Sequence, residues 1–562
     1  MLITLATIGF FIITIFSQGL RLPVLLFTPF AIPSDAIPDN TPLSSISSAP
    51  FGYYSKAAIV ADAPGCAAQG RSENRTYILD ARETAPANAT EDMFVDKVPN
   101  IHVHGPLAIA IPSELKGYYV AWKKFGTLPW SDLFEDSIKM CREGTPVTPT
   151  LDTILKIFGD RLPVRTPLWH LLHNESEGRL KTTNEIVTRP ELGDFLERVA
   201  ADPEALLNGS LVKEIADDLA EAGSIITLKD LVDYEPLWRP PLEMPLRSKS
   251  IEADLRLITP PPPSSGVLVG LALNALANFN YTDGNNFTGN ATLYYHRLAE
   301  VLKFTFAKRS LLPDECCNNK EDEKLLKSLM TLETADEIAA KVTDNGTHNT
   351  SYYGSVFLPP SDQGTAHVCL VGPNGDAISI TSTINTPFGS CVIGSRTGIL
   401  FNNEMDDFST PGSPNAFGLP PSSKHFIRPG ARPISSMTPI IITNASNGTL
   451  RVIIGAAGGS RIITSTLQAA YANLNLGVNM KQAIDSIRIH HQLVPDELHY
   501  EMEMPSTIVE RLNILGHNVI EGGMKAAVQG IEVSGSPCPG ESEGHCLLAY
   551  SDYRKGGDHA GL

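Results

Sequence analysis

Residues 364–385 constrain the fold more than any other stretch, because they predict a β-hairpin of defined register. Two runs rich in β-branched side chains, 365–371 and 377–384, are joined by Gly-Pro-Asn-Gly-Asp at 372–376. Proline favours the first central position of a type I turn, and the following glycine suits a left-handed position. Together they predict a three-residue hairpin loop with a bulge.

This turn fixes which residues face each other across the hairpin. If Gly372 pairs with Asp376, counting outward places Thr365 opposite Thr383, with Asn385 two residues further along the same face. Two hydroxyls and an amide would then share one surface. Threonine pairs across strands are usually structural, so this pattern alone gives only weak support for a catalytic site.

Composition sets broad limits on fold and partners. The 562 residues are 42% hydrophobic and 19% charged, which is typical of a globular chain with a large core. This length fits two to four domains or one long layered α/β domain. The net charge of −18 disfavours nucleic acid or an anionic membrane surface as a partner.

The N-terminus predicts entry into the secretory route. Residues 2–16 are almost entirely apolar, and we interpret residues 1–30 as a signal peptide or a signal anchor. A Pro/Ser-rich stalk follows over residues 31–55. The protein is therefore expected on the extracellular face of the plasma membrane, held by a single span, or secreted.

N-glycosylation sequons support the same location. Any single sequon is a frequent chance match, but many in one chain favour a secreted or membrane-anchored glycoprotein. The sequons lie at Asn74, Asn88, Asn174, Asn208, Asn280, Asn286, Asn290, Asn345, Asn349, Asn444 and Asn447. The eight cysteines fit an oxidising compartment, and Cys538 and Cys546, which flank a Pro/Gly-rich loop, are a plausible bridge.

No metal site is expected. The chain has no CxxC pair that would indicate zinc, and His102 and His104 lack a third ligand nearby in sequence. We interpret these two as half-buried histidines on a strand. Dinucleotide-binding GxGxxG, P-loop, HExxH and GxSxG motifs are also absent, which removes several enzyme classes.

Helices are predicted on both sides of the hairpin in sequence. Residues 112–126, 267–276 and 294–309 have helical patterns, and residues 314–353 are polar and typical of a surface arm. After the hairpin, residues 439–454 predict a second hairpin. A helix that Ser460 caps and Gly477 closes should follow.

Gly458 and Gly459 precede that helix directly. Their backbone N–H groups would suit an oxyanion hole, although a tight turn explains two glycines equally well. Ser435 and Ser436 are ordinary loop residues unless they face a carboxylate.

Charged residues offer two further alternatives. Glu404, Asp406 and Asp407 form an acidic cluster, which is either a solvated loop or a site that recognises a substrate ammonium group. Arg82 stands beside Glu83 and by itself predicts no more than a surface ion pair.

The order of these motifs resembles the γ-glutamyltransferases. The resemblance rests on Gly364-Thr365, Thr381-Ser-Thr-Ile-Asn385, Asn402-Asn-Glu-Met-Asp-Asp-Phe408, Pro433-Ile-Ser-Ser-Met437 and Gly455-Ala-Ala-Gly-Gly459. It extends to Asp80-Ala-Arg-Glu-Thr-Ala-Pro86, Gly126-Thr-Leu-Pro-Trp130, Pro262-Pro-Ser-Ser-Gly266, Tyr295-His-Arg-Leu-Ala-Glu300 and Ser551-Asp-Tyr-Arg-Lys-Gly-Gly557. It therefore covers nearly all of the chain from about residue 56.

The resemblance implies an α/β (α+β) fold, the four-layer αββα sandwich of N-terminal-nucleophile hydrolases. It also implies that a precursor cuts itself between Gly364 and Thr365. The products would be a heavy chain, 56–364, and a light chain, 365–562, which remain associated within one αββα domain.

It further implies roles for individual residues. Thr365 would be the nucleophile and Thr383 would orient its hydroxyl, while Gly458 and Gly459 would stabilise the oxyanion. Arg82, Ser435 and Ser436 would hold the donor α-carboxylate, and Asn385, Glu404 and Asp407 its α-amino group.

The implied activity is γ-glutamyl transfer and glutathione hydrolysis without a cofactor. Glutathione or another γ-glutamyl compound would form a γ-glutamyl ester on Thr365, which passes to water, an amino acid or a dipeptide. A related self-processing acylase that acts on another amide is a second interpretation, and the two substrate-binding sets argue against it.

The chain departs from the family pattern after Cys66. Relatives carry there an Ala/Gly-rich helix and a glycine-rich core strand, whereas here Arg75-Thr-Tyr-Ile already follows. A loss of core packing costs several kcal/mol. The alternative is therefore an inactive or unprocessed glycoprotein of the same fold. Cys391 replaces a lysine that is frequent in relatives.

Overall fold

The structure is a computed structural model of the whole chain. It describes residues 47, 51–61, 67–72, 75–97, 101–251, 253–283, 286–287, 290–313, 319–354, 364–412, 421–522 and 526–562. The expected signal segment and most of the stalk, apart from residues 47 and 51–55, lie outside these residues. Cys66, Cys316 and Cys317 also lie outside them.

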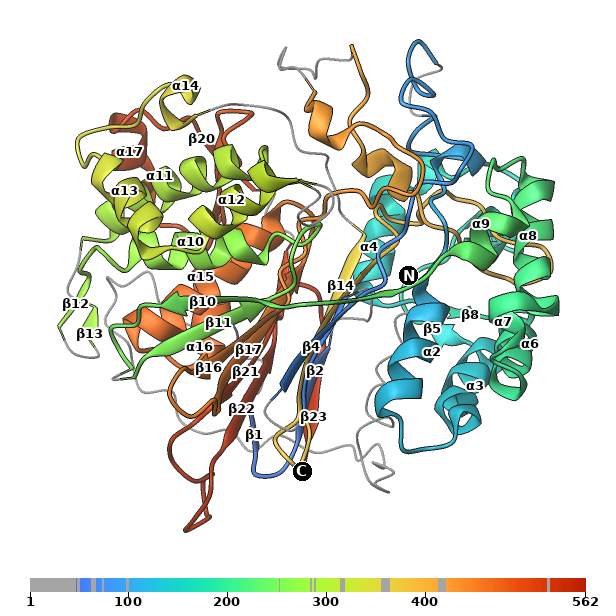
Figure 1. Cartoon of the computed structure of the whole chain (residues 1–562), viewed down its shortest axis with the longest axis horizontal. Helices are drawn as coiled ribbons and strands as arrows, with labels where there is room; N and C mark the ends of the chain where they lie inside the picture. The colour runs from blue at the N-terminus through green and yellow to red at the C-terminus, as the bar shows by residue number, and fades with distance from the viewer. Residues whose placement is uncertain are drawn as a thin grey trace.

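Two seven-stranded sheets form the centre of the molecule (Figure 1). The first has the order β1 (Gly52–Tyr54), β22 (Leu547–Ser551), β21 (Ala527–Val533), β17 (Leu450–Ala457), β16 (Ile440–Asn444), β11 (Leu255–Thr259) and β10 (Leu242–Leu246). The second has the order β23 (Asp558–Gly561), β2 (Ala58–Ala61), β14 (Thr365–Val371), β15 (Ala377–Thr383), β3 (Ala67–Ser72), β4 (Arg75–Asp80) and β9 (Leu237–Arg239).

The predicted hairpin forms the centre of the second sheet. Strands β14 and β15 pair antiparallel with Thr365 opposite Thr383, so the register derived from the turn is confirmed. The amide N–H of Gly372 donates to the carbonyl of Asp376 at 2.8 Å, and Gly375 adopts φ +80°. The local chemistry of the turn therefore sets the register of the whole hairpin.

The two sheets pack face to face. Every second residue of β14 points into the interface, where apolar side chains of both sheets form a dry core. That core contains Ala58, Val60, Cys369, Val371, Ala377, Ile441, Ile453, Ile531, Leu547 and Ala549.

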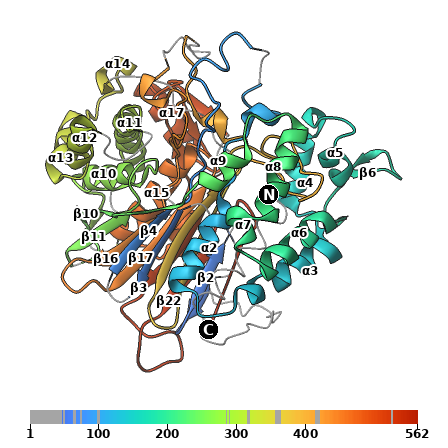
Figure 2. The ribbon, with the colours of Figure 1, turned by 45° about the vertical axis from the view of Figure 1, so that its right-hand side comes forward.

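Helices cover the outer face of each sheet, which completes the predicted αββα order (Figure 2). Over the first sheet lie α10 (Gly266–Leu276), α11 (Ala291–Arg309), α12 (Lys320–Leu329), α13 (Leu332–Lys341), α14 (Thr350–Tyr353), α15 (Arg461–Leu476), α16 (Met480–Asp485) and α17 (Ser506–Ile514). On the side of the second sheet lie α2 (Glu114–Phe125), α3 (Glu135–Glu143), α4 (Pro149–Phe158), α5 (Pro167–Leu172), α6 (Pro190–Ala201), α7 (Ala205–Asn208), α8 (Ser210–Ala222) and α9 (Leu228–Asp233).

Three expectations about local structure were wrong. Of the polar surface arm predicted over 314–353, the described part, 319–353, is instead packed on the core, because α12 and α13 are amphipathic and bury Leu326, Leu329 and Ile338. His102 and His104 lie in a turn instead of a strand. Ser460 precedes α15, but its hydroxyl donates to Gln492 instead of capping the helix.

The strand β3 bears directly on the shortened region after Cys66. It pairs with β15 on one side and β4 on the other, so the described strands of the second sheet remain contiguous. The short connection from β3 to β4 therefore leaves no gap in this ladder.

Two further observations concern the compartment. Cys538 and Cys546 form the predicted disulfide. Within the described ranges, no helix has both the length and the apolar character needed to cross a membrane.

Glu114, at the start of α2, makes stability depend on pH. It accepts hydrogen bonds from Tyr118 at 2.7 Å and Ser382 at 3.1 Å, and burial raises its pKa from 4.5 to about 7. A carboxyl whose pKa is higher in the folded state stabilises the protein at low pH. That contribution is lost as the pH rises from 4.5 through 7.

We therefore expect Glu114→Gln to stabilise the protein at pH 8 and to have little effect at pH 4.5. Part of the Glu114 side chain remains exposed, so screening limits the gain to about 1 kcal/mol. Thermal unfolding of both proteins at the two pH values measures it. An equal shift at both pH values would contradict the assignment.

Candidate functional site

Thr365 opens β14 and is buried, with 1% of its surface exposed. Its hydroxyl donates to Thr383 Oγ1 over a long 3.4 Å. The backbone N–H of Asn385 donates to the same Thr383 oxygen at 2.8 Å. Thr383 therefore accepts two hydrogen bonds and is held in place beside the Thr365 hydroxyl.

The peptide bond before Thr365 is tightly enclosed. The Gly364 N–H donates to the Asn385 carbonyl, and a Cβ atom at Gly364 would lie 2.6 Å from the Thr386 carbonyl oxygen. Only glycine fits at that distance. On the other side of Thr365, Lys555 Nζ donates to the Thr365 carbonyl at 2.7 Å. The Asn385–Thr386 segment on one side and Lys555 on the other thus fix the backbone of the Gly364–Thr365 junction.

Gly458 and Gly459 lie at the same end of the sandwich as Thr365. The His367 ring, two residues after Thr365, packs against Gly455 of β17, and the glycine pair follows where β17 ends. Both glycines have positive φ, +128° and +65°. This conformation favours glycine and turns the chain into α15.

Arg82 joins the acidic cluster in a buried ion network. Its Nη1 lies 2.8 Å from Glu404, and its Nη2 forms an ion pair with Asp407. All three side chains are almost fully buried. The prediction of a surface ion pair at Arg82 was therefore wrong, and so was a solvated loop for Glu404 and Asp407.

Asn385 Oδ1, just beyond the end of β15, is buried without a hydrogen-bond donor among the described residues, whereas Glu404 is a further hydrogen-bond partner of Asp407. Burial raises the pKa of Asp407, and the Arg82 guanidinium opposes that rise. Buried acceptors without donors are costly, and a ligand that brings N–H groups would satisfy them.

The backbone of Arg82 is held by a further set of groups. Its N–H donates to Asp80 at 3.1 Å, while Tyr234 donates to its carbonyl at 3.0 Å. Arg432 also donates to that carbonyl. These contacts fix the strand end from which the guanidinium projects.

Ser435 and Ser436 lie in a buried loop that packs on the Pro-Pro-Pro-Ser-Ser turn. Ser265 donates to the Ser435 carbonyl at 2.6 Å, and Arg309 Nη2 donates to Ser436 Oγ at 2.9 Å. Because that bond uses an acceptor site of Ser436, the serine proton is left to be donated elsewhere.

Arg309 and Lys555 are the residues that sequence reasoning missed. Arg309 ends the predicted helix α11, and Lys555 belongs to the C-terminal Arg-Lys-Gly-Gly motif, so both were within recognised patterns. Only the structure shows that Arg309, at the end of its helix, is 2% exposed, and this burial is what indicates a role for it.

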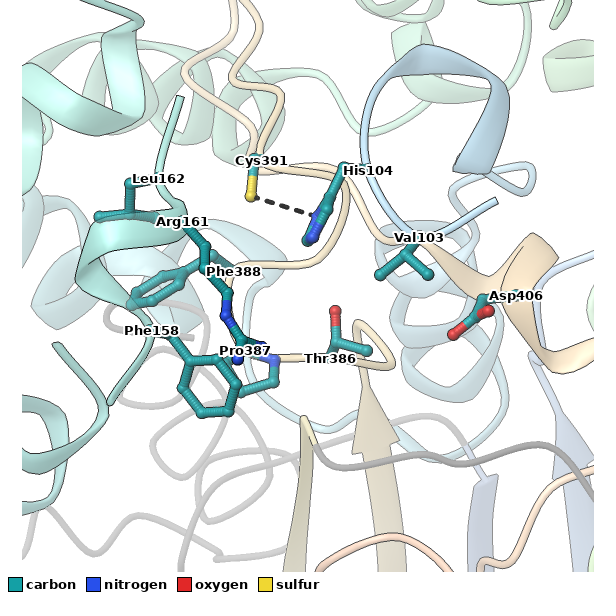
Figure 3. Close-up of a pocket in the computed structure, with 10 residues that line it drawn as sticks. All are labelled: Val103, His104, Phe158, Arg161, Leu162, Thr386, Pro387, Phe388, Cys391 and Asp406. Carbon is teal, nitrogen blue, oxygen red and sulfur yellow. Dashed lines mark hydrogen bonds between the residues drawn. The ribbon is translucent and has the colours of Figure 1, made fainter. Parts of the chain in front are cut away.

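A cavity of about 250 Å³ lies beside this site (Figure 3). Thr386, which abuts Gly364, and Asp406, which precedes Asp407, form part of its wall. The other lining residues are Val103, His104, Phe158, Arg161, Leu162, Pro387, Phe388 and Cys391.

One group of side chains has the composition of a metal site: His296, Glu300 and His517. Glu300 accepts hydrogen bonds from Thr347 and Tyr353, each at 2.7 Å. The ammonium group of Lys303 lies 3.5 Å from Glu300, and its positive charge opposes a cation. We interpret this group as a hydrogen-bonded structural cluster.

The contact between Arg309 and Ser436 leads to a prediction. Arg309→Met removes the donor that orients Ser436 and a second, smaller positive charge, besides Arg82, that opposes the pKa rise of Asp407. If the site binds the γ-glutamyl donor that the sequence resemblance implies, the KM for that donor should rise about tenfold, with a smaller change in kcat. Steady-state kinetics with γ-glutamyl-p-nitroanilide measures both constants.

Arg309→Lys is the matched control because it retains the charge and should recover most of the affinity for the donor. Two results would contradict the role of Arg309. One is that kcat and KM change equally in Arg309→Met and Arg309→Lys, and the other is that KM does not change in Arg309→Met.

Comparisons with known proteins show the family of the chain. A family model described as gamma-glutamyltranspeptidase matches residues 66–562. The chain is 37% identical over 491 residues to Scoloptoxin SSD14 of Scolopendra dehaani, covering 87% of this chain and 82% of that protein. It is 35% identical over 498 residues to Glutathione hydrolase 2 of Arabidopsis thaliana, covering 86% and 82%.

A solved structure supports the fold. The cephalosporin acylase of Bacillus halodurans superposes with a TM-score of 0.75 at 19% identity, covering 96% of this chain and 99% of that chain. The family match spans most of the chain, including every residue of the site described above. The chain belongs to the gamma-glutamyltranspeptidase family.

Proposed function

We propose that this protein cleaves itself between Gly364 and Thr365 and then acts as an extracellular γ-glutamyltransferase and glutathione hydrolase. The observation that carries the proposal is the position of Thr365. It stands at the start of a central strand, after a glycine that the fold requires, with its hydroxyl directed to Thr383.

Self-cleavage begins at the Thr365 hydroxyl. Its oxygen attacks the Gly364 carbonyl carbon, the C–N bond to Thr365 breaks, and the nitrogen gains a proton. Water then hydrolyses the resulting ester, which leaves Gly364 with a carboxylate and Thr365 with a free α-amino group. A threonine hydroxyl is a weak nucleophile and needs an adjacent base, and this free amine can act as that base.

Turnover uses the same atoms. The Thr365 amine takes the hydroxyl proton as the oxygen attacks the γ-carbonyl carbon of the donor, and the amine of the leaving group departs with that proton. The N–H groups of Gly458 and Gly459 stabilise the tetrahedral oxyanion. Water or an acceptor amine then attacks the γ-glutamyl ester, which breaks the bond to Thr365 and restores its hydroxyl.

Recognition of the donor follows from the ion network. Arg82 with Ser435 and Ser436 binds the α-carboxylate, while Asn385, Glu404 and Asp407 bind the α-ammonium group. Without a donor, Arg82 is paired with Glu404 and Asp407. An α-amino acid brings one charge of each sign, so it can replace these pairs without leaving a buried charge alone.

The sheet order explains how the two chains remain together after cleavage. The light chain, 365–562, would supply β14, β15 and β23, and the heavy chain, 56–364, would supply β2, β3, β4 and β9 of the same sheet. Strand β2 lies between β23 and β14, so backbone hydrogen bonds join the chains on both of its edges.

Turnover of two anilides tests the proposal. The purified full-length protein should release p-nitroaniline from γ-glutamyl-p-nitroanilide, and adding glycylglycine should yield γ-glutamylglycylglycine. Glutaryl-p-nitroanilide lacks the α-amino group and is expected to react at least about 100-fold more slowly.

Two results would contradict the proposal. Faster turnover of the glutaryl compound would favour an acylase of another amide. An uncleaved single chain without release from either anilide would favour the inactive glycoprotein.

A further inference from the structure

The side-chain amide of Asn385, just beyond the end of β15, uses its two ends differently. The residue is fully buried. Its Nδ2 donates to the Asn403 carbonyl at 3.1 Å, whereas its Oδ1 has no donor among the residues that the structure describes. A buried amide oxygen without a donor costs stability, so this oxygen is available to a ligand that supplies an N–H group.

Asn403 determines which end of this amide is left for a ligand. A side-chain amide presents N–H donors at one end and an acceptor oxygen at the other. Because the Asn403 carbonyl accepts from Nδ2, the acceptor oxygen of Asn385 is the end that remains. The opposite orientation would present N–H groups, which repel an ammonium group and attract a carboxylate.

Asn403 is held against the chain on both sides of Asn385. Its N–H donates to the Ile384 carbonyl at 3.3 Å, and its Oδ1 accepts from the N–H and the hydroxyl of Thr386 at 3.1 and 3.0 Å. Its Nδ2 donates to the Val103 carbonyl at 2.9 Å. Both polar atoms of the buried Asn403 side chain are therefore bonded, and its carbonyl is fixed opposite the Asn385 amide.

Asn403 also connects this amide to the acidic cluster. It directly precedes the short helix η4 (Glu404–Asp407), which carries the two carboxylates that pair with Arg82. The Asn385 amide is thus bonded to the residue immediately before Glu404. An acceptor oxygen and carboxylates on neighbouring segments favour a positively charged N–H donor as the ligand.

We propose that Asn403 is a positioning residue for donor recognition, which holds the Asn385 amide with Oδ1 toward the α-ammonium group of the γ-glutamyl donor. The inference rests on the proposed function and deepens it, because it explains how the site distinguishes an α-amino acid from the same acid without the amine. Asn403 acts through Asn385. Without the Asn403 side chain, the Asn385 amide can turn and present Nδ2, which weakens the binding of the ammonium group.

Kinetics with two anilides test the role of Asn403. γ-Glutamyl-p-nitroanilide and glutaryl-p-nitroanilide differ only in the α-amino group. We expect Asn403→Ala to raise the KM for the γ-glutamyl compound about tenfold and to change kcat/KM for the glutaryl compound less than about twofold. A general loss of structure would instead affect both compounds alike.

Asn274→Ala is the matched control. Asn274 is equally buried, near the end of α10, and its amide also bonds to two backbone groups, the Pro245 carbonyl and the Arg247 N–H. Its removal should lower the free energy of unfolding without changing the KM for the γ-glutamyl compound.

Thr386→Val provides a milder test if Asn403→Ala does not fold. It removes only the hydroxyl that donates to Asn403 Oδ1 and keeps the backbone N–H bond and the branched shape. We expect the KM for γ-glutamyl-p-nitroanilide to rise about threefold, with little change for the glutaryl compound. Thr386→Ser keeps the hydroxyl and should retain the wild-type KM.

Binding of two acids that do not react separates this inference from the proposed function. L-Glutamate and glutarate carry no leaving group, so calorimetric titration of the purified full-length proteins does not depend on turnover. Weaker binding of glutamate by Asn403→Ala, with unchanged binding of glutarate, supports the inference even if the wild-type protein releases nothing from either anilide. Equal changes for both acids, no change for either, or no binding of glutamate by the wild-type protein would overturn it.

Discussion

Thr365→Ala remains a single uncleaved chain and loses at least about 10⁴-fold of γ-glutamyl turnover, if Thr365 is the nucleophile of both reactions. The substitution removes the only hydroxyl that the hairpin register directs at Thr383 from β14. Without that oxygen, neither the Gly364 carbonyl nor a donor carbonyl has an attacking group. Gel analysis and release of p-nitroaniline measure the two effects separately.

Thr365→Ser is the matched control. It keeps the oxygen and loses only a methyl group, so cleavage and turnover should persist at a reduced rate. A Thr365→Ala protein that still cleaves would show that another residue attacks the Gly364 carbonyl. If Thr365→Ser did not cleave at all, cleavage would require the packing of the threonine methyl group as well as the hydroxyl.

Arg82→Met is expected to have the second largest effect. Arg82 compensates two buried carboxylates, and removing one partner of a buried ion pair costs about 3–5 kcal/mol of unfolding free energy. The KM for the γ-glutamyl donor should also rise at least about 100-fold, since the α-carboxylate loses its cation. Chemical denaturation and steady-state kinetics check these two results.

The loss of stability in Arg82→Met should depend on pH. Burial raises the pKa of Asp407, and Arg82 is the largest influence that lowers it. Removing Arg82 therefore raises that pKa further above the unfolded value. A group of this kind contributes stability at low pH that is lost as the pH rises through its folded pKa. Arg82→Met should be more strongly destabilised at pH 8 than at pH 5.

The double variant Arg82→Met/Asp407→Asn separates charge from packing. Removing both charges leaves fewer buried charges alone, so the protein should regain part of the stability that the single variant lost. The charge argument would be contradicted if the double variant lost the sum of the unfolding free energies that Arg82→Met and Asp407→Asn each lose alone.

Turn chemistry allowed the sequence to predict the hairpin in detail. Pro373 and Gly375, two residues apart in the turn, set the register that places Thr365 opposite Thr383, and this is a local effect. The helices α10 and α11 could also be predicted, because their apolar patterns are local in the sequence and continuous.

Contacts between distant segments could not be predicted from sequence patterns. Arg82 meets Asp407 across 325 residues, and no local pattern indicates that the two share a buried network. The same holds for Arg309 and Ser436, and for Lys555 and the Thr365 carbonyl. The resemblance to a family supplied the grouping of site residues, and the structure added the ion pairs that form without a donor.

The shortened region after Cys66 shows a further limit. The sequence predicts that core structure is lost, but it does not show that β3 pairs with both β15 and β4. The ladder from β15 through β3 to β4 is continuous, so the hairpin that begins at Thr365 keeps a paired neighbour on this side of the second sheet.

The N-terminal sequence of the smaller chain of the purified full-length protein tests the account most directly. The account predicts two associated chains, of which the smaller begins Thr365-Ala-His-Val and carries a free α-amino group. A single intact chain, or a smaller chain that begins at any other residue, would contradict it.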